Sequence, residues 1–286
     1  MKGYVATIGM FDGVHRGHQF VLHEVVSEAR ALGLQSLCIT FDHSPRQEQV
    51  LTPLEQKVRL IRQTGIDRVE VLAFTPELKA LTAKEFMEQM LRDHWGVRVL
   101  LTGYDNRFGH NREEGFDDYV QYGQELGIEV RQLRAEGEIS SSLIRQLIAE
   151  GNISKANELL GHPYALLGRV EHGKHIGTQM GFPTANIMAD DQRQLIPASG
   201  AYAVKVSIGD DTTWKAGMMN IGTRPTFDGN HQTLEVNIFD FDEDLYGKSL
   251  CVEFVSRLRE ERRFESMEAL REQLRKDEIQ AKNEIL

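Results

Sequence analysis

The stretch Tyr4–Phe20 reads YVATIGMFDGVHRGHQF and decides the fold of the first half of the chain. Its first five residues, Tyr4–Ile8, form an apolar run with the length of a buried strand, and Gly17–Leu32 has the periodicity of an amphipathic helix. Glycines at positions 9, 13 and 17 let the intervening backbone turn tightly and approach a ligand closely. A strand, a glycine-rich turn and a helix in this order predict the start of a parallel α/β domain.

The same alternation of strand and helix continues to about residue 160. It predicts further strands at Ser36–Thr40, Arg68–Ala73, Arg98–Thr102 and Ile128–Leu133, and further helices at Leu54–Gln63, Ala83–His94 and Phe116–Leu126. Such a chain folds as a parallel sheet with helices on both faces, and ligands bind beyond the carboxyl ends of its strands. The loops after the first and fourth strands are therefore the places where chemistry is expected.

The second half of the chain has a different pattern. Helices are expected at Ser141–Ala149 and Ser154–Leu160, and after His162-Pro163 come short strands separated by turn sequences (GDD, TRPTFDGN, DEDLYG). These strands are Tyr164–Val170, Gly200–Ile208, Thr213–Asn220, Leu234–Phe239 and Leu250–Val255, followed by a helix at about Ser266–Asn283. We expect an antiparallel barrel with a terminal helix, and a domain boundary that divides residues 1–161 from 162–286.

Composition narrows the class of protein. The 286 residues fit about two domains, and 41% hydrophobic with 27% charged residues is ordinary for a soluble globular chain rather than a disordered one. The net charge of −10 argues against nonspecific binding to nucleic acid or to an anionic membrane. It does not exclude a small anionic ligand, because local basic groups and helix N-termini can bind one.

The cysteines and the chain's start indicate a cytoplasmic protein. Cys38 and Cys251 are far apart in apolar runs, so they predict reduced core residues rather than a zinc site or a disulfide framework. The first residues, MKGYVATIG, lack the anatomy of a signal peptide, and no apolar run has the length of a membrane span.

The first candidate site lies in the glycine-rich turn. His15 and His18 flank Gly17 where the helix is expected to begin, and imidazoles beside the free N–H groups of a helix N-terminus can hold a polyphosphate. Two histidines three residues apart can also mark a surface helix start or half of a metal site. The strand-to-helix context and the glycines favour the phosphate interpretation, since no further ligands are nearby.

Two later segments share the polar character of a nucleotide site. TGYDNRFGHNREEG, residues 102–115, follows the fourth strand, and ISSSLIR, residues 139–145, opens a helix. Taken alone, the first is a solvated loop and the second a helix cap, but exposed amides and Arg145 can also bind a phosphate.

Together the three segments resemble the adenylyltransferase module of bacterial bifunctional riboflavin kinase/FAD synthetases, whose pattern is roughly GxFDGVHxGH, GxDFRFGxxRxG and ISSTxIR. The resemblance implies that the phosphate of FMN attacks the α-phosphate of ATP directly. It implies that His15 and His18 stabilise charge on the phosphates, and that Ser141, Ser142 and Arg145 hold the triphosphate. The remaining residues that it assigns to the flavin and nucleotide walls are Gly9, Phe11, Asp12, Gly17, Asp105, Asn106, Arg107 and Phe108.

Two residues depart from that pattern. Asn106 stands where the family usually has an aromatic residue, and Ser142 where it often has threonine. The serine is a mild change, whereas loss of the aromatic residue is expected to weaken packing or stacking at the flavin.

The second half contains the sharp string GFPTANI, residues 181–187. Gly181 and Pro183 belong to an expected loop-like backbone, on which Thr184 and Asn186 can turn oxygen atoms toward one point. Hydroxyl and amide oxygens suit Mg²⁺, which accompanies nucleotide phosphates. For the string alone, the alternative is a structural turn with locally bonded Thr and Asn.

With AGMMNIGTRPT (216–226), EVNIFDFDEDLYG (235–247) and RLREERRF (257–264), this string resembles the riboflavin kinase module of the same family. The resemblance implies that Glu235 is the general base for the ribityl 5′-hydroxyl, which attacks the γ-phosphate of ATP. It places Gly181, Pro183, Asn220 and Arg224 at the substrates. Thr178 departs from the pattern, because the family often has arginine there. If that arginine binds phosphate in relatives, either Lys174 or His175 must replace it here or the affinity for ATP falls.

Two other patterns are misleading. GRVEHGK, residues 168–174, has Walker A spacing, but His175 replaces the Ser or Thr that should bind Mg²⁺, and no helix follows. His172 and His175 have no cysteine or carboxylate cluster beside them that would complete a metal site.

The sequence thus predicts a bifunctional enzyme that converts riboflavin to FMN and FMN to FAD plus pyrophosphate, with Mg-ATP in both steps. Its partners are riboflavin, FMN and ATP, with neither nucleic acid nor a membrane, and the oligomeric state is open. The alternatives are a chain with one working activity and a flavin-binding regulator. Glu235, Thr184 and Asn186 argue against the regulator, because flavin binding alone requires neither a base nor a metal site.

Overall fold

A computed structural model describes residues 3–43, 49–104, 106–110, 113–134, 137–171, 181–209, 211–226 and 229–285. Within these ranges, residues 224–226 and 229–231 are described as backbone. The chain divides into two compact units, residues 1–141 and 142–286, and each is described by itself. The boundary expected after residue 161 stays a prediction.

The first unit contains a five-stranded sheet in the order β3-β2-β1-β4-β5. All four strand pairs are parallel, which confirms the expected class of sheet. The central strands are β1 (Tyr4–Ile8) and β4 (Val97–Thr102), flanked by β2 (Gln35–Phe41), β3 (Arg68–Leu72) and β5 (Glu129–Gln132). Because β1 and β4 are direct neighbours, the loops that follow them begin side by side at the carboxyl edge of the sheet.

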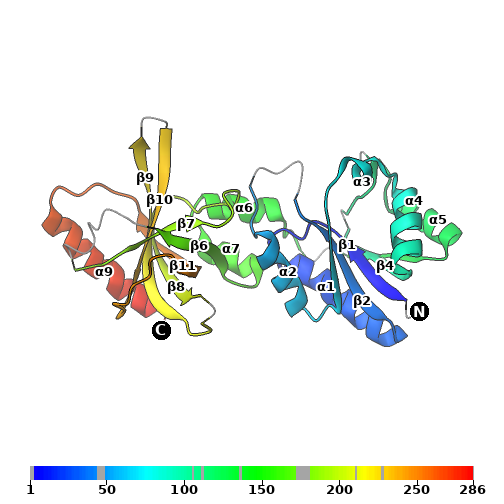
Figure 1. The fold of residues 1–286 in the computed structure, drawn as a ribbon, viewed down its shortest axis with the longest axis horizontal. Coiled ribbons are helices and arrows are strands. Elements are labelled where there is room, and N and C mark those ends of the chain that lie inside the picture. The colour runs from blue at the N-terminus through cyan, green and yellow to red at the C-terminus, as the bar shows by residue number, and fades with distance from the viewer. Residues whose placement is uncertain are drawn as a thin grey trace. The chain divides into compact units, whose positions relative to one another are not determined.

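Helices cover both faces of this sheet (Figure 1). They are α1 (Arg16–Leu32), α2 (Leu54–Gln63), α3 (Pro76–Ala80), α4 (Ala83–Phe86), the π-helix η1 (Met87–Trp95) and α5 (Phe116–Leu126). The period-two alternation of β1 divides the core, since Val5 packs with α1 and α2 residues while Ala6 and Ile8 pack with α4, η1 and α5 residues.

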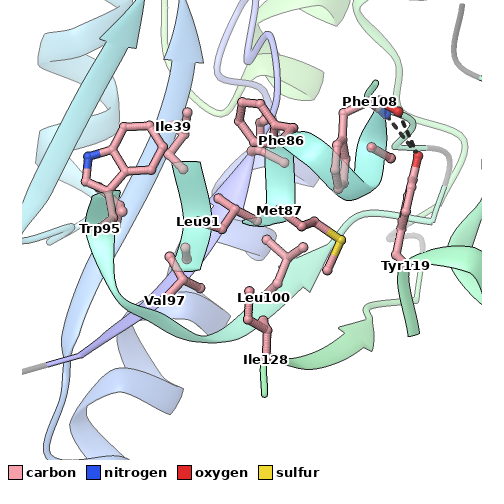
Figure 2. Packing of buried hydrophobic residues seen from close by; sticks show 14 residues of the cluster. Ile39, Phe86, Met87, Leu91, Trp95, Val97, Leu100, Phe108, Tyr119 and Ile128 are labelled. Carbon is pink, nitrogen blue, oxygen red and sulfur yellow. Dashed lines mark hydrogen bonds between the residues drawn. The ribbon is translucent and has the colours of Figure 1, made fainter. Parts of the chain in front are cut away.

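Figure 2 shows the core on the second of these faces. Phe108, in the loop after β4, packs flat on Tyr119 with ring centroids 4.3 Å apart. The Tyr119 hydroxyl accepts from the Phe108 N–H at 3.0 Å and donates to its carbonyl at 3.2 Å. This buried pair anchors the loop on the core and so fixes where its polar residues emerge.

One expected helix of the first unit is divided in the structure. The segment Ala83–His94, expected as a single α-helix, is α4 followed by the π-helix η1. Met87, Leu91 and Trp95 are its buried residues and recur every four positions, a spacing that the wider π turn keeps on one face. Helix α3 was not expected, although Thr75 caps it and Pro76 opens it.

The second unit is a closed antiparallel barrel in the order β10-β7-β6-β11-β8-β9. Its strands are β6 (Tyr164–Glu171), β7 (Ala185–Ala189), β8 (Gly200–Ile208), β9 (Lys215–Thr226), β10 (Gly229–Ile238) and β11 (Ser249–Glu260). The C-terminal helix α9 (Met267–Ile285) packs on the outside of the barrel, where Ala281 is fully buried (Figure 1). Arg259 on β11 fixes the helix by donating from Nε to the buried Asp277 at 2.9 Å. Barrel and terminal helix confirm the expected class.

Helices α6 (Ser141–Ala149) and α7 (Ile153–Leu160) precede the barrel. The side chain of Asn157 on α7 donates to the Phe254 carbonyl at 2.8 Å and accepts from the Tyr164 N–H at 2.8 Å. These two bonds tie α7 to β6 and β11.

The barrel also corrects the expected strands. It has six strands where five were expected, because the GFPTANI string runs into strand β7 (Ala185–Ala189) rather than being a loop throughout. The turn expected over residues 223–230 is shorter, since β9 runs to Thr226 and pairs with β10 from Gly229 onward. The Pro and Gly signals lie inside a long hairpin, and β11 likewise continues to Glu260.

Candidate active sites

The turn after β1 has a strained backbone. Phe11, Gly13 and Val14 have φ values of 49°, 84° and 39°, and left-handed backbone is unfavourable for Phe and especially for the β-branched Val14. Such conformations persist where the surrounding structure holds them, and they cluster at functional sites.

Side chains from other elements hold this turn through alternate carbonyl groups. The Asn106 amide, in the loop after β4, donates to the Ile8 carbonyl. Four residues further along, Ser141 donates from its hydroxyl to the Asp12 carbonyl at 2.9 Å. Residues from all three motifs of the first half are therefore bonded within one cluster.

The carbonyl between these two, that of Met10, accepts two donors. One is the Thr40 hydroxyl on β2 at 3.2 Å, and the other is the Lys57 ammonium on α2, also at 3.2 Å. The same ammonium donates to the Phe41 carbonyl at 2.7 Å. Lys57 therefore links the turn after β1 to the end of β2.

The carboxylate of Asp12 is buried and fixes a neighbouring segment. It accepts from the backbone N–H groups of Leu51 at 2.9 Å and Thr52 at 3.1 Å. In return, the Thr52 hydroxyl accepts from the Gly13 N–H at 3.0 Å. Asp12 thus stabilises the turn, a structural role that the sequence did not distinguish from ligand contact.

The two predicted histidines lie together at the N-terminus of α1. His15 is the N-cap residue, and its Nδ1 accepts from the His18 N–H at 3.3 Å. The imidazole rings stack with centroids 3.6 Å apart and an interplanar angle of 16°. Gly17 permits this packing, because a Cβ there would lie 3.3 Å from two atoms of the His15 ring.

Two properties of His18 are typical of a ligand-binding side chain. Its pKa lies well below the ordinary value, because burial disfavours the charged ring and because His15 and Lys57 add positive charge nearby. In the part of the chain that the structure describes, its buried Nδ1 has no hydrogen-bond partner. An unpaired buried polar atom costs free energy, and a bound anion could supply the missing acceptor.

The other residues predicted for this site are distributed as follows. Arg107 is exposed and Asn106 half-buried in the loop after β4, whereas Phe108 is only 7% exposed and belongs to the core. Ser142 is exposed, and Arg145 lies one turn after Ser141 on α6. Asp105 lies outside the described residues.

Four polar residues, three of them predicted for the site, lie opposite one another on adjacent strands of the barrel and form one lateral row across these strands. Glu235 on β10 is directly opposite Asn186 on β7 and Asn220 on β9, and Asn186 is also opposite Glu171 on β6. Directly opposed residues in an antiparallel pair project from the same face of the sheet. Glu235 therefore shares one face with two amide side chains and a second carboxylate.

A glycine leaves space beside this row. A Cβ on Gly222 would lie 3.1 Å from a Glu261 carboxylate oxygen, 3.2 Å from the Thr233 hydroxyl and 3.3 Å from the Asn220 amide nitrogen. Polar groups of β9, β10 and the segment after β11 thus surround a position without a side chain.

Packing of one side chain and a hydrogen bond to the backbone fix the loop that precedes β7. Gly181 has a φ of 81°, which favours glycine, and Phe182 packs on the cluster beneath α9. The Pro183 carbonyl accepts from the Asn237 amide at 2.6 Å. Thr184 follows half-buried, two residues before Asn186 and so on the same face of the extended chain.

Several predictions concern residues that the structure does not describe. Lys174, His175, Thr178 and His172 lie outside the described residues, as does the side chain of Arg224. Within the described ranges, no group of three or more His, Cys, Asp or Glu residues is arranged to hold a metal ion.

Sequence reasoning missed Lys57, Thr52 and Glu261. Thr52 is in a segment without a recognisable pattern of its own, and Glu261 lies within the RLREERRF motif (257–264), none of whose residues was singled out. Lys57 did leave a signal, because it precedes Ile61 by one helical turn and so occupies the buried face of α2, where a lysine is unusual.

Comparison with protein families divides the chain in the same order as the two sites. The family model described as FAD synthetase matches residues 1–144, and the one described as riboflavin kinase matches residues 160–285. The fold and site therefore define a nucleotidyltransferase unit of the α/β class followed by a kinase barrel.

Curated relatives match over almost the whole length. The bifunctional riboflavin kinase/FMN adenylyltransferase of Escherichia coli K12 is 39% identical, with 98% of this chain and 92% of the relative covered. The enzyme of that name from Bacillus subtilis is 32% identical over 97% and 91% of the two chains. A solved structure described as a macrolide-efflux protein from Streptococcus pneumoniae has a TM-score of 0.90 at 32% identity, covering 99% of this chain and 94% of its own.

The chain belongs to the bacterial bifunctional riboflavin kinase/FMN adenylyltransferase family. It phosphorylates riboflavin to FMN with ATP and adenylylates FMN to FAD. Among the residues that the structure describes, none of the helices has the length and apolar character needed to span a membrane.

Proposed function

We propose that FMN adenylylation takes place at the turn after β1, where the stacked pair His15 and His18 opens α1. The observation that carries this assignment is the unpaired, buried Nδ1 of His18 in a turn held by three other segments. A phosphate oxygen is the complementary group for a neutral imidazole N–H and for the free backbone N–H groups at a helix N-terminus.

The reaction at this site needs positioning and charge stabilisation rather than a covalent intermediate. The FMN phosphate attacks the α-phosphorus of ATP and pyrophosphate leaves, so negative charge moves from the attacking group to the leaving group. His15 and His18 would donate hydrogen bonds to the phosphates, while Ser141, Ser142 and Arg145 would hold the triphosphate. The walls would be formed around Gly9, Phe11, Asp12, Gly17, Asp105, Asn106 and Arg107, with Phe108 anchoring the loop from the core.

We assign riboflavin phosphorylation to the face of the barrel that carries Glu235. The observation that supports it is the lateral row in which Glu235 is opposite Asn186 and Asn220. The carboxylate would accept the proton of the ribityl 5′-hydroxyl as its oxygen attacks the γ-phosphate of ATP. Gly181, Pro183, Asn220 and Arg224 would contact the substrates around it.

The same face suits a magnesium ion. Thr184 and Asn186 offer hydroxyl and amide oxygens on one face of the chain, beside the carboxylates of Glu171 and Glu235 in the register of the strands. Oxygen ligands of this kind fit Mg²⁺, which keeps several waters and is shared with nucleotide phosphates. When bound, the ion would neutralise charge on the phosphates of ATP.

We further propose that the enzyme works in the cytoplasm, with riboflavin, FMN and ATP as its small-molecule partners and without nucleic acid or a membrane. The net charge of −10 disfavours nucleic acid, since the protein would repel a polyanion, and it leaves the local binding of ATP to the groups described above.

A reciprocal pair of substitutions tests both assignments. Glu235→Gln removes the base but keeps the side-chain volume, so FMN formation should be abolished while supplied FMN is still converted to FAD. His18→Ala should lower FAD formation by roughly 10²–10³-fold, the usual cost of one charge-matched contact, and spare the kinase reaction. Products formed from riboflavin or FMN with Mg-ATP are separated by chromatography.

Exposed residues of the same types serve as controls. Glu243→Gln in the segment after β10 and His23→Ala on α1 should leave both reactions unchanged, because both side chains are exposed. Unchanged FAD formation in His18→Ala would remove that histidine from the mechanism. Loss of both activities in either test variant would indicate a folding defect or coupled sites.

A further inference from the structure

Lys57 is a buried charged residue that has no role in the two reactions as proposed above. It lies on α2 and is only 4% exposed. Its ammonium donates to the Phe41 carbonyl at 2.7 Å and to the Met10 carbonyl at 3.2 Å. In the segments that the structure describes, no carboxylate lies within salt-bridge distance of it, so its partners are backbone carbonyls at the ends of two strands.

Burying this ammonium is costly, which makes an incidental position implausible. Its pKa is lowered because burial disfavours the charged form, an effect that the attraction of Asp12, Cys38 and Asp42 only partly offsets. A methionine of similar length would fill the same space without that cost. What a methionine lacks is the pair of donors that joins the two carbonyls.

The two carbonyls lie in the strained turn after β1 and at the end of β2. Met10 immediately precedes Phe11, which with Gly13 and Val14 has a left-handed backbone, and His15 follows directly. Phe41 ends β2, so the ammonium connects the strained turn to a rigid neighbouring strand. Thr40, on that same strand, donates the second hydrogen bond to the Met10 carbonyl. Among the described residues, it is the Lys57 ammonium that bonds both this carbonyl and that of Phe41.

We propose that Lys57 is a positioning residue for adenylyl transfer, which holds the turn that carries His15 and His18 by bridging the carbonyls of Met10 and Phe41. This inference rests on the proposed role of the histidines. Lys57 acts through the backbone and touches no reacting atom.

The position of Lys57 also gives it an electrostatic effect on the site. The charged and titratable groups that act on His18 are His15, stacked on it, and Lys57. Both favour the neutral ring. Burial is the main cause of the lowered pKa of His18; the fixed ammonium adds to it, and it adds positive charge near the phosphates once they are bound.

The test compares three single variants in the full-length protein. Lys57→Met removes the bridge and the charge, Lys57→Arg keeps donors and charge, and Arg59→Met removes an exposed charge from the same helix. For Lys57→Met we expect kcat for FAD formation to fall by about 10²-fold, the usual effect of misplacing a reacting group by about 1 Å, with little change in KM. Lys57→Arg should recover part of that loss, and Arg59→Met should behave as the parent.

A spectroscopic measurement distinguishes positioning from a general loss of structure. In histidine NMR titrations, the pKa of His18 should move toward its ordinary value in Lys57→Met and stay unchanged in Arg59→Met. Riboflavin phosphorylation at the barrel is the internal control and should equal that of the parent. Should Lys57→Met not fold, Thr40→Val takes its place, because it removes the neutral donor to the same Met10 carbonyl and should lower kcat by a smaller factor.

Three outcomes would overturn the inference. One is parental kcat in folded Lys57→Met, or in Thr40→Val where that variant replaces it. The second is a rise in KM with unchanged kcat, which would make Lys57 a binding residue. The third is an equal loss in Lys57→Met and Arg59→Met. If His18→Ala retains full FAD formation, the proposed function fails; if His18→Ala is inactive while Lys57→Met is fully active, only the present inference fails.

Discussion

His18 combines three features on one side chain. Its ring stacks on a second imidazole, its Nδ1 is buried without a partner among the described residues, and its pKa is lowered. Of these features, the unpaired buried atom costs free energy in the free protein. Under the proposed function, a phosphate group would satisfy the unpaired atom, and the strained turn with left-handed Phe11 and Val14 would place His18 to receive it.

The lowered pKa of His18 predicts a pH dependence of stability. The unfolded chain binds the proton with an ordinary pKa of about 6.5, whereas the folded ring binds it only at lower pH. Between these two values the unfolded state holds more protons, so the free energy of unfolding falls as the pH decreases below about 7. In His18→Asn this loss should be smaller, measured as the denaturation midpoint of the first unit from pH 7.5 to 5.5.

His23 provides the matched control, because it is an exposed histidine on the same helix. His23→Asn should leave the pH dependence as in the parent. A steeper loss of stability at low pH in His18→Asn than in the parent would show that the ring is charged in the folded state, contrary to this account.

For helices and strands, the local sequence pattern was sufficient to predict an element where one or both of its faces are buried. The central strand Tyr4–Ile8 and the helix Leu54–Gln63 have the bounds that the apolar pattern predicts. Strand β7 could not be found in this way, because Gly181 and Pro183 are turn residues by local preference. Its ladder with β6 and β10 depends on partners distant in the sequence.

The candidate sites were predictable to a similar extent. Motif residues such as His15 and Glu235 could be named from the sequence, since their chemistry and spacing are local. The bonds of Asn106 to the Ile8 carbonyl and of Lys57 to the Met10 carbonyl could not, because they join segments 98 and 47 residues apart. Asn106, which departs from the family's aromatic residue, thereby has a structural role of its own.

The close contact of β6 with β7 predicts the effect of one glycine. A Cβ on Gly168 would lie 2.5 Å from the Ile187 side chain and 2.5 Å from the Met188 carbonyl oxygen. Gly168→Ala should therefore push β7 away and destabilise the barrel by about 1–3 kcal/mol, as overpacking does. Thermal unfolding and kinase activity measure this effect, and FMN adenylylation is the internal control. A parental unfolding temperature would contradict the packing described for these strands.

For the whole molecule, the two units correspond to consecutive steps, since FMN is the product of the barrel reaction and the substrate of the α/β reaction. Because the net charge is −10, ATP binding must depend on local groups, which for adenylylation we propose to be His15, His18 and Arg145. The overall field excludes neither reaction, because a binding site is governed by the charges nearest to it.

The central claim is that one chain contains two separate active sites, one at His18 and one at Glu235. Mixing the two single-site variants tests it most directly, with FAD measured after addition of riboflavin and Mg-ATP. We predict that His18→Ala alone accumulates FMN and forms FAD roughly 10²–10³-fold more slowly than the parent. Glu235→Gln alone should leave riboflavin unchanged, and the equimolar mixture should form FAD because FMN made by one variant reaches the other. FAD formed at the parental rate by either variant alone, or no more FAD from the mixture than from the separate variants, would contradict the claim.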